Sequence, residues 1–244
     1  MKRVSRIGIA AACVALPLTA KAADLGGMPP AYPVAPQVVA SWTACYAGLN
    51  LGGGWAQATL FDPVANIGLG SVNPAGFVGG GQVGCDFQVG QFVFGVQGMA
   101  SAADIRGTQL QPNGVFTTNF NIPWVETLTA RVGFAVLPVT LLYVKGGGAW
   151  VRDNVWTSAG GVTVGTGIIT PTGWTAGFGA EFLFYRNWSA FVEYDYSSFA
   201  KTRIALIPSS GSAIPIDVNH NVQTLLVGVN FRFGAPLSPS PASY

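Results

Sequence analysis

The stretch Gly173–Tyr196, GWTAGFGAEFLFYRNWSAFVEYDY, contains the pattern that decides the fold. Every second residue from Trp174 to Phe184 is aromatic or alanine, and Thr, Gly, Glu and Leu lie between them. After YRN the alternation resumes from Trp188 to Tyr196. Strict alternation predicts two β-strands, and the short interruption predicts a tight turn between them. The acidic residues of this hairpin share the face of the small residues and are Glu181, Glu193 and Asp195.

The composition excludes an ordinary water-soluble domain. Half of the residues are hydrophobic and only 9% are charged, whereas soluble domains carry about 25% charged residues. No apolar run of about 18 or more residues follows the N-terminus, which excludes membrane-spanning helices. Many glycines and aromatic residues without a helical span favour a membrane β-barrel. The net charge of +2 gives no reason to expect a nucleic-acid partner.

The N-terminus has the three parts of a secretory signal. MKRVSR is basic, IGIAAACVALPL is apolar, and the AKA of residues 20–22 fits the small-x-small cleavage rule. Residues 1–22 are therefore predicted to be a signal peptide, and residues 23–41, rich in Pro and Gly, a flexible periplasmic lead-in. Residues 42–233 are predicted to form an outer-membrane barrel, followed by a Pro/Ser-rich tail at 234–244.

Alternation and turn signals predict eight strands, at about 42–56, 75–87, 92–103, 123–136, 140–154, 172–184, 188–199 and 220–233. Three connections are short: QVGQ (88–91), LPVT (137–140) and YRNW (185–188). The other four, around 57–74, 104–122, 155–171 and 200–219, are long and rich in Gly, Pro, Asn, Ser and Thr. Short periplasmic turns alternating with long external loops are typical of outer-membrane barrels. The predicted fold is all-β, an eight-stranded antiparallel up-and-down transmembrane β-barrel with both termini periplasmic.

Aromatic residues recur at a spacing that fits a membrane. Phe77 and Phe87 are ten residues apart on one face of a strand, and two other strands repeat this spacing. Ten residues at about 3.3 Å rise, tilted roughly 40°, climb about 25 Å, the height of a lipid-facing band. Ordinary aromatic packing in a soluble β-core is the alternative. The predicted girdles are Trp55, Phe77, Trp124, Trp150, Trp174 and Tyr196 on the external side, and Phe87, Phe92, Phe134, Phe184, Trp188, Phe231 and Phe233 on the periplasmic side.

The opposite face of each strand then points into the barrel. It carries a predicted polar network of Asn50, Gln82, Asp86, Gln97, Arg131, Lys145, Glu181, Glu193, Asp195 and Arg232. The interior of an eight-stranded barrel is just wide enough for side chains to fill. Opposite charges should pair there, because an unpaired buried charge is costly. This predicts a polar, largely plugged lumen, and a narrow pore in which these charges meet only water is the alternative.

Two cysteines, Cys45 and Cys85, remain after removal of the signal, in an oxidising compartment. Both are predicted near the periplasmic ends of neighbouring antiparallel strands, on the same face. A disulfide is predicted, although a register slip of one pair would forbid it and leave free thiols. Neither a CxxC motif nor a nearby histidine accompanies them, so no metal or cofactor site is predicted.

Several stretches resemble one known family: WTACYAGLNLGGGW (42–55), GFVGGGQVGCDFQVGQFVFGVQG (76–98), TARVGFAV (129–136), LLYVKGGGAW (141–150), GWTAGFGAEF (173–182), WSAFVEYDY (188–196) and VGVNFRF (227–233). The chain resembles the alphaproteobacterial outer-membrane immunogenic, porin-like family, which belongs with the eight-stranded barrels of the outer membrane protein A type. The resemblance implies an abundant surface-exposed protein described as a porin or an antigen, with some members binding haemin. The Pro/Ser tail departs from the family pattern.

The predicted function is an integral outer-membrane barrel that serves envelope integrity and displays its external loops. A narrow porin for ions or small solutes is the alternative, and haemin or other ligand binding by the loops is a third reading. The predicted partners are outer-membrane lipid and lipopolysaccharide, and the barrel-assembly machinery that reads the last strand, QTLLVGVNFRF. No nucleic-acid partner is predicted, and the sequence does not identify a ligand for the loops.

Neither an enzyme nor a soluble carrier is predicted. Catalysis on lipids needs a base held beside a nucleophile. The single histidine, His220, is expected to be a solvated loop residue, with Ser197 or Ser198 as its candidate partners. A soluble lipid carrier would need a charged outer face, which this composition does not supply.

Overall fold

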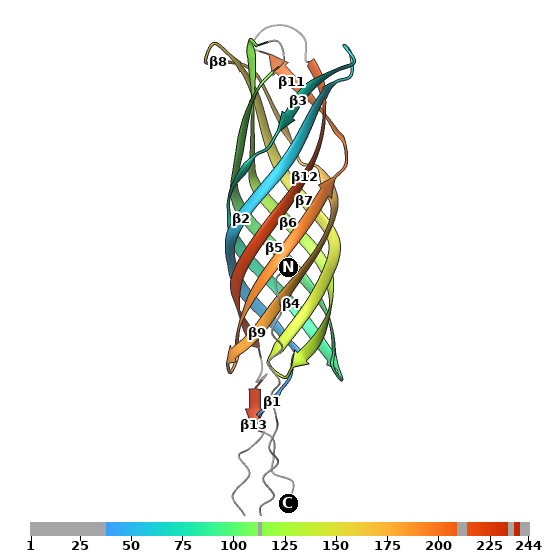
Figure 1. Ribbon diagram of the computed structural model, residues 1–244, viewed down its shortest axis with the longest axis vertical. Coiled ribbons are helices and arrows are strands. Elements are labelled where there is room, and N and C mark those ends of the chain that lie inside the picture. Colours follow the sequence, from blue (N-terminus) through green and yellow to red (C-terminus); the bar gives the residue numbers. More distant parts are fainter. Residues whose placement is uncertain (1–37, 112–113, 209–213, 234–236, 240–244) are drawn as a thin grey trace, which may run out of the picture. The chain divides into compact units, whose positions relative to one another are not determined.

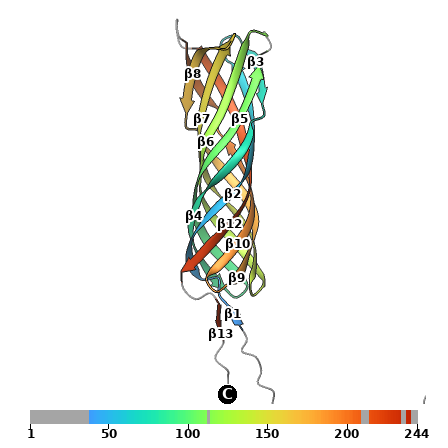
Figure 2. The ribbon, with the colours of Figure 1, turned by 90° about the vertical axis from the view of Figure 1, so that its left-hand side faces the viewer.

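The computed structural model describes residues 38–111, 114–208, 214–233 and 237–239, all within one compact unit, Pro36–Tyr244. Eight long antiparallel strands form a closed ring (Figures 1 and 2). In ring order they are β2 (Ala44–Asp62), β4 (Ala75–Val89), β5 (Phe92–Leu110), β6 (Phe116–Leu137), β7 (Thr140–Ala159), β9 (Thr172–Tyr185), β10 (Trp188–Phe199) and β12 (Ile214–Phe233). Pairing of β12 with β2 closes the ring. The predicted eight-stranded barrel is confirmed.

The two ends of the barrel are built differently. At one end, called the turn end, β4 joins β5, β6 joins β7 and β9 joins β10 through two-residue turns, as predicted. Gly90 and Arg186 sit in two of these turns with positive φ values of 63° and 31°. Such a backbone is easy for glycine and unusual for other residues. The opposite end, called the hairpin end, carries the long connections.

The four connections at the hairpin end are long, as predicted, but they are largely strand rather than loop. Three of the four segments contain further strands, β3 (Ile67–Val72), β8 (Val162–Ile169) and β11 (Thr202–Pro208), and the fourth is occupied by the ends of β5 and β6. β3 pairs with β2, β8 with β7, and β11 with β12 and β8. Alternating Thr, Val and Ile within these segments favour strands, and pairing satisfies their backbone hydrogen bonds. The Gly, Asn and Ser residues that suggested loops lie on the same strands.

Two further short strands lie outside the barrel wall. β1 (Val38–Ala40) pairs antiparallel with β13 (Leu237–Pro239). These residues were predicted to belong to a flexible lead-in and a separate tail, so the prediction needs correction at 38–40 and 237–239. Cys45 pairs with Phe233 at the closing seam, which brings the start of β2 beside the end of β12. Residues 1–22, predicted to be a signal peptide, and residues 23–37 lie outside the described residues.

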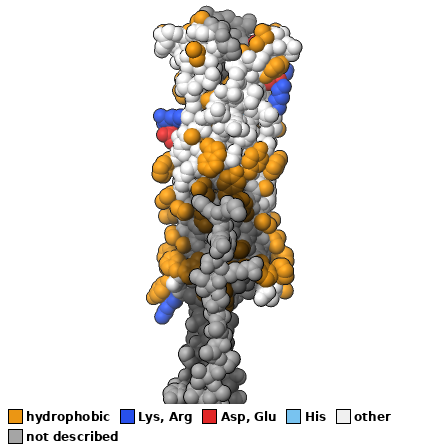
Figure 3. Space-filling model, in the orientation of Figure 1, with side chains coloured by type: hydrophobic (Ala, Val, Ile, Leu, Met, Phe, Trp, Pro, Cys, Tyr) orange, Lys and Arg blue, Asp and Glu red, His pale blue; other side chains and the backbone are white. Residues whose placement is uncertain are grey.

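Side chains alternate between the interior and the outer surface along each strand, as the β pleat requires. Leu49, Phe178 and Val227 are 69%, 60% and 47% exposed. Figure 3 shows hydrophobic side chains gathered over the part of the barrel nearer the turn end, with few charged side chains on this face. No helix among the described residues is long and apolar enough to cross a membrane.

The strand pairing at the hairpin end predicts a pattern of proteolysis. Arg106 pairs with Asn121 and Arg152 with Trp124, whereas Lys201 lies between β10 and β11. We expect trypsin to cut the folded, detergent-solubilised protein after Lys201 well before Arg106 or Arg152, because proteases need locally unpaired backbone. Mass spectrometry of timed digests would show the order. Early cleavage after Arg106 or Arg152 would mean that these segments are mobile loops.

Candidate functional site

Two arginines and two acidic residues meet in the barrel interior. Arg131 donates from Nε to Asp86 Oδ1 at 2.7 Å and from Nη1 to Glu181 Oε2 at 3.1 Å. Arg232 donates from Nη1 to Glu181 Oε1 at 2.9 Å and also pairs with Asp86. Asp86 (β4) and Glu181 (β9) are on opposite walls of the ring, and so are Arg131 (β6) and Arg232 (β12). Each arginine therefore links two opposite walls, and the four side chains cross the lumen.

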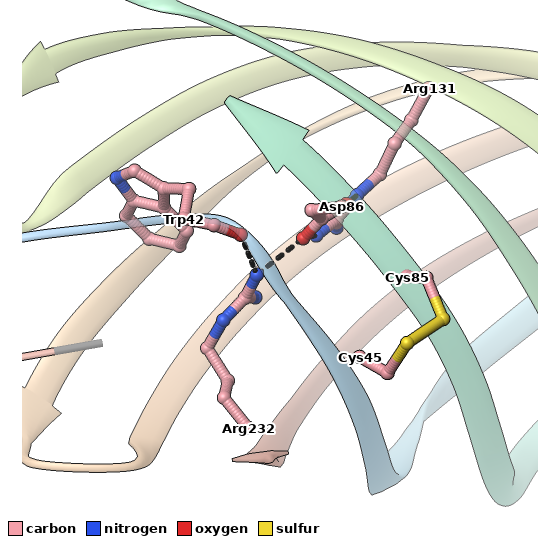
Figure 4. The surroundings of a disulfide bond; sticks show 6 residues. All are labelled: Trp42, Cys45, Cys85, Asp86, Arg131 and Arg232. Carbon is pink, nitrogen blue, oxygen red and sulfur yellow. Dashed lines mark hydrogen bonds and ion pairs between the residues drawn. A yellow bond between two sulfur atoms is a disulfide. The ribbon is translucent and has the colours of Figure 1, made fainter. Parts of the chain in front are cut away.

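Neighbouring groups hold these four side chains in place. Ser189 donates to Glu181 at 2.6 Å. Arg232 donates to the backbone oxygen of Trp42 at 2.7 Å, as Figure 4 shows. The guanidinium carbon of Arg131 lies 4.8 Å from the centre of the Tyr46 ring, a cation–π contact. Close packing leaves no room at Gly95, where an added Cβ would lie against Asp86 and Arg131.

A second charged group lies on the neighbouring strands. Lys145 Nζ on β7 donates to Glu193 Oε1 at 2.6 Å and lies 3.1 Å from Asp195 Oδ2, both on β10. Tyr143 donates to the other Glu193 oxygen at 2.7 Å. All four side chains are buried. These two groups together hold four carboxylates (Asp86, Glu181, Glu193 and Asp195) against three cations (Arg131, Lys145 and Arg232).

A chain of amides completes the polar layer. Asn50 donates to Gln82 at 2.7 Å, and Gln82 donates to Asn230 at 2.7 Å. Asn230 in turn donates to Glu181 at 3.1 Å. This bond joins the amides to the group formed by Arg131, Arg232, Asp86 and Glu181, called the arginine cluster. Gln97 is buried, but its side-chain oxygen has no partner among the described residues. The structure therefore brings nine of the ten predicted polar residues into hydrogen-bonded groups and leaves Gln97 outside them.

Apolar layers lie on either side of the polar layer. At the turn end, Trp42 packs with buried Val93, Ala135, Leu141, Tyr143 and Leu183. Toward the hairpin end, a larger cluster includes Leu60, Ile105, Phe120, Ile122, Val151, Phe199 and Val218, contributed by strands around the ring. These layers were not predicted, because within the membrane the alternation places apolar side chains on the outer face.

The expectation that His220 is a solvated loop residue is wrong. It lies in β12, is 3% exposed, stacks on Phe199 at 4.8 Å between ring centroids and meets the edge of Phe120. Its Nε2 lies 3.4 Å from a carboxylate oxygen of Asp153 on β7, which is also buried. Ser197 donates to Thr175 instead, at 3.0 Å. Neither ring nitrogen of His220 has a hydrogen-bond partner among the described residues, so it pairs with neither Ser197 nor Ser198.

An ion group in which two exposed basic side chains cover Asp217 lies at the hairpin end. Arg203 Nε donates to Asp217 Oδ1 at 2.8 Å, and Lys201 Nζ lies 3.0 Å from Oδ2. Hydrogen bonds from Arg203 and Lys201 lower the pKa of the Asp217 carboxyl to about 2. Its contribution to stability is present above the ordinary carboxyl pKa and is lost as the pH falls through about 2. Both basic side chains are more than half exposed, so the contribution is small.

The predicted girdle residues lie on the outer surface. Twelve of the thirteen are at least 37% exposed, and Tyr196 is partly buried against Trp174 at 5.7 Å between ring centroids. Phe92 contacts Phe134, and Trp188 contacts Phe231. Glu126 and Arg152 also point outward and were not among the predicted site residues. Each lies two residues after a girdle tryptophan, Trp124 or Trp150, so the alternation of the strand could have predicted that it points outward.

The disulfide joins the first two strands of the barrel. Cys45 on β2 and Cys85 on β4 are direct partners in the ladder and are bonded through sulfur (Figure 4). Asp86, the next residue, points to the opposite face and into the arginine cluster. Because the strand alternates, the disulfide fixes the register of the strand that carries Asp86.

The sequence matches the outer membrane protein beta-barrel domain over residues 10–233. The chain belongs to this family. It is 30% identical over 234 residues to the 31 kDa outer-membrane immunogenic protein of Brucella melitensis, covering 88% of this chain and 94% of that one. The 25 kDa outer-membrane immunogenic protein of Brucella canis is 29% identical over 233 residues, covering 94% and 98%. OprG of Pseudomonas aeruginosa shares 10% identity with a TM-score of 0.49, covering 79% of this chain and 98% of that one.

Family membership confirms the predicted relationship and the outer-membrane location. In such barrels the short turns face the periplasm and the long connections face outward. The turn end is thus the periplasmic end, and the hairpin end is the external end. The arginine cluster lies on the strand segments that carry the lipid-facing band, and the Asp153–His220 pair lies beyond the external girdle.

The arginine cluster predicts a large loss of stability on truncation. Arg232→Ala would leave Asp86 and Glu181 buried with one arginine between them. We expect the free energy of unfolding to fall by about 3–5 kcal/mol, because an uncompensated buried charge is strongly destabilising. Urea titration of the lipid-folded protein, followed by tryptophan fluorescence, would measure it. The control is Arg106→Ala, whose surface pair with Asp104 should contribute less than about 1 kcal/mol; equal losses would contradict the role given to the cluster.

The contact between Asp153 and His220 predicts that substitutions of the two residues have non-additive effects on the free energy of unfolding. Burial raises the pKa of Asp153 to about 8 and lowers the pKa of His220 to about 4, so both side chains are neutral near pH 7. His220→Leu alone leaves the buried Asp153 carboxyl without this polar neighbour and should lower the free energy of unfolding by about 1–3 kcal/mol. The double change Asp153→Leu and His220→Leu should recover that loss, because an apolar pair suits the surrounding cluster. The same urea titration would measure both. A double variant as unstable as the sum of its single changes would show that the pair is not coupled.

Proposed function

We propose that this protein is an outer-membrane barrel whose lumen is closed to solutes, and that it serves envelope integrity and presents its hairpins at the cell surface. The observation that carries the proposal is the crossing of the lumen by Arg131, Arg232, Asp86 and Glu181. The side chains of Asp86 and Glu181 are 0% exposed, those of Arg131 and Arg232 at most 1%. Side chains that contact one another directly across the lumen leave little space for a continuous row of water molecules.

The apolar layers support the same proposal. Above the ion pairs, Phe120, Ile122 and Leu60 belong to a buried cluster that spans several strands. Below them, Trp42 packs against the interior at the periplasmic end. Water in an apolar constriction lacks hydrogen-bond partners, so these layers oppose conduction even if the ion pairs open. A solute would have to disrupt three successive layers.

The external hairpins are well suited to display. They extend the sheet beyond the lipid-facing band, so strand pairing orders a surface of Thr, Asn, Ser and Gly side chains. Ordered surfaces are easier for a partner to recognise, because less entropy is lost on binding. Haemin binding through His220 is not favoured, because that side chain is buried. Lipopolysaccharide and the barrel-assembly machinery remain proposed partners, the latter acting on β12 with its terminal Phe231 and Phe233.

Single-channel recording in planar bilayers tests the proposal. The unmodified protein should show rare or very small openings, Arg131→Ala should open more often, and Arg131→Ala combined with Phe120→Ala should open most, because two layers are then removed. Arg106→Ala, which changes an exposed arginine, is the matched control and should behave like the unmodified protein. A large steady conductance in the unmodified protein would overturn the closed lumen and favour a narrow porin.

A further inference from the structure

Four side chains form a patch on the lipid-facing wall at the external girdle. Trp124 and Glu126 of β6 and Trp150 and Arg152 of β7 all point outward. Trp124 is the ladder partner of Arg152, and Glu126 is the partner of Trp150. The two charges therefore occupy opposite corners of the patch, with a tryptophan at each remaining corner. Figure 2 shows β6 and β7 with β5 in the upper part of the barrel.

The two charges have no partner within the described part of the chain. Diagonal neighbours in a ladder lie about 7–8 Å apart at their Cα atoms, within reach of long side chains. No hydrogen bond or ion pair between described residues involves Glu126 or Arg152. Glu126 is also the one Asp, Glu, Lys or Arg side chain that points outward between the two girdles in the described strands. A charge on the lipid face is disfavoured, so its presence calls for a partner from outside the chain.

The surface is hollowed at the same place. A hollow of about 370 Å³ is lined by Trp124, Glu126, Trp150, Arg152 and Thr170. A furrow of about 510 Å³ begins at Glu126 and Trp150 and passes over small residues that include Ala100, Gly98, Gly81 and Ala47. The row of ladder partners from Trp150 through Glu126, Ala100 and Gly81 to Leu49 crosses five strands. At about 4.8 Å per strand it is about 19 Å long.

The order of the groups along the membrane normal restricts the ligand. Arg152 follows Trp150 on the external side, and Glu126 follows Trp124 on the periplasmic side. A bound lipid must therefore offer an anion toward the exterior and hydrogen-bond donors just beneath it. The furrow ends near Ala47, close to the periplasmic start of β2, so an acyl chain can follow it into the membrane.

We propose that this patch binds one phosphorylated glycolipid of the external leaflet. Arg152 pairs with a phosphate, and Glu126 accepts hydrogen bonds from hydroxyl or amide N–H groups where the acyl chains join the sugar. The tryptophans pack beside the sugar at the interface, and one acyl chain fills the furrow. A glycerophospholipid offers only ester oxygens at that depth, which cannot donate to a carboxylate. The proposal requires the barrel to lie in the outer membrane and is independent of whether the lumen is closed.

Native mass spectrometry of the detergent-solubilised protein with purified lipid A or phosphatidylglycerol tests the site. We expect one lipid A per chain, bound about tenfold more tightly than phosphatidylglycerol, since one charge-assisted hydrogen bond is worth at least that factor. Glu126→Leu should remove this preference and leave phosphatidylglycerol binding unchanged. Arg152→Gln should weaken both lipids, because both carry a phosphate. Both residues are exposed, so the variants should fold, which heat-modified migration on gels would verify.

Arg186→Gln is the matched control, because Arg186 is another exposed arginine, in a periplasmic turn. It should change neither affinity. Equal binding of the two lipids, or unchanged lipid A binding by Glu126→Leu, would overturn the proposal. A dimer that Glu126→Leu dissociates would also overturn it and assign the patch to a second copy of the chain. Conductance should be the same in Glu126→Leu and the unmodified protein. The lipid-binding proposal and the closed-lumen proposal can therefore be rejected independently of each other.

Discussion

The double crossing of Arg131 and Arg232 with Asp86 and Glu181 is the constraint on which the barrel depends. A guanidinium group carries five donors in a rigid plane, so each arginine can satisfy two carboxylates from opposite walls. Such pairs are weak evidence for net stability, because desolvation opposes the Coulomb attraction. Their effect on register is stronger. A slip of one residue in any of the four strands would turn a charge toward lipid, at a cost of several kcal/mol.

The face of a strand that is apolar changes along its length. Near the periplasm, β12 points Leu225, Val227 and Val229 at lipid and Asn230 and Arg232 inward. Near its external end the same parity buries Ile216, Val218 and Val222 and leaves Asn219 exposed. Within the lipid band the barrel is therefore apolar outside and polar inside. Beyond the band it is polar outside and apolar inside, as in a soluble protein. The solvent outside each segment, lipid or water, determines which face is apolar.

This change of solvent explains what the sequence could and could not predict. Glu181, Glu193 and Asp195 share the small-residue face of one hairpin, so parity was sufficient to predict an inward polar set and two girdles. Beyond the girdles, alternation continues but its apolar face is reversed, and Asn, Pro and Gly at those positions suggested loops. The partnership of His220 with Asp153 depends on curvature across the barrel, which no local pattern encodes. Glu126 was readable from its parity with Trp124.

In this barrel wall, the polarity of a side chain follows from its depth in the membrane and from the face of the strand that carries it. The residues that depart from this rule are the informative ones. Asp153 and His220 are polar side chains placed inside an apolar layer, where hydrophobic residues would pack as well. Glu126 is an acid on the lipid face, where its neighbours are Trp, Ala and Gly. Local conflicts with an otherwise consistent pattern are where function is expected, because packing alone does not explain them. The inward pair meets only protein, whereas Glu126 and Arg152 lie open to the external leaflet, so the outer wall is the surface on which a ligand can be recognised.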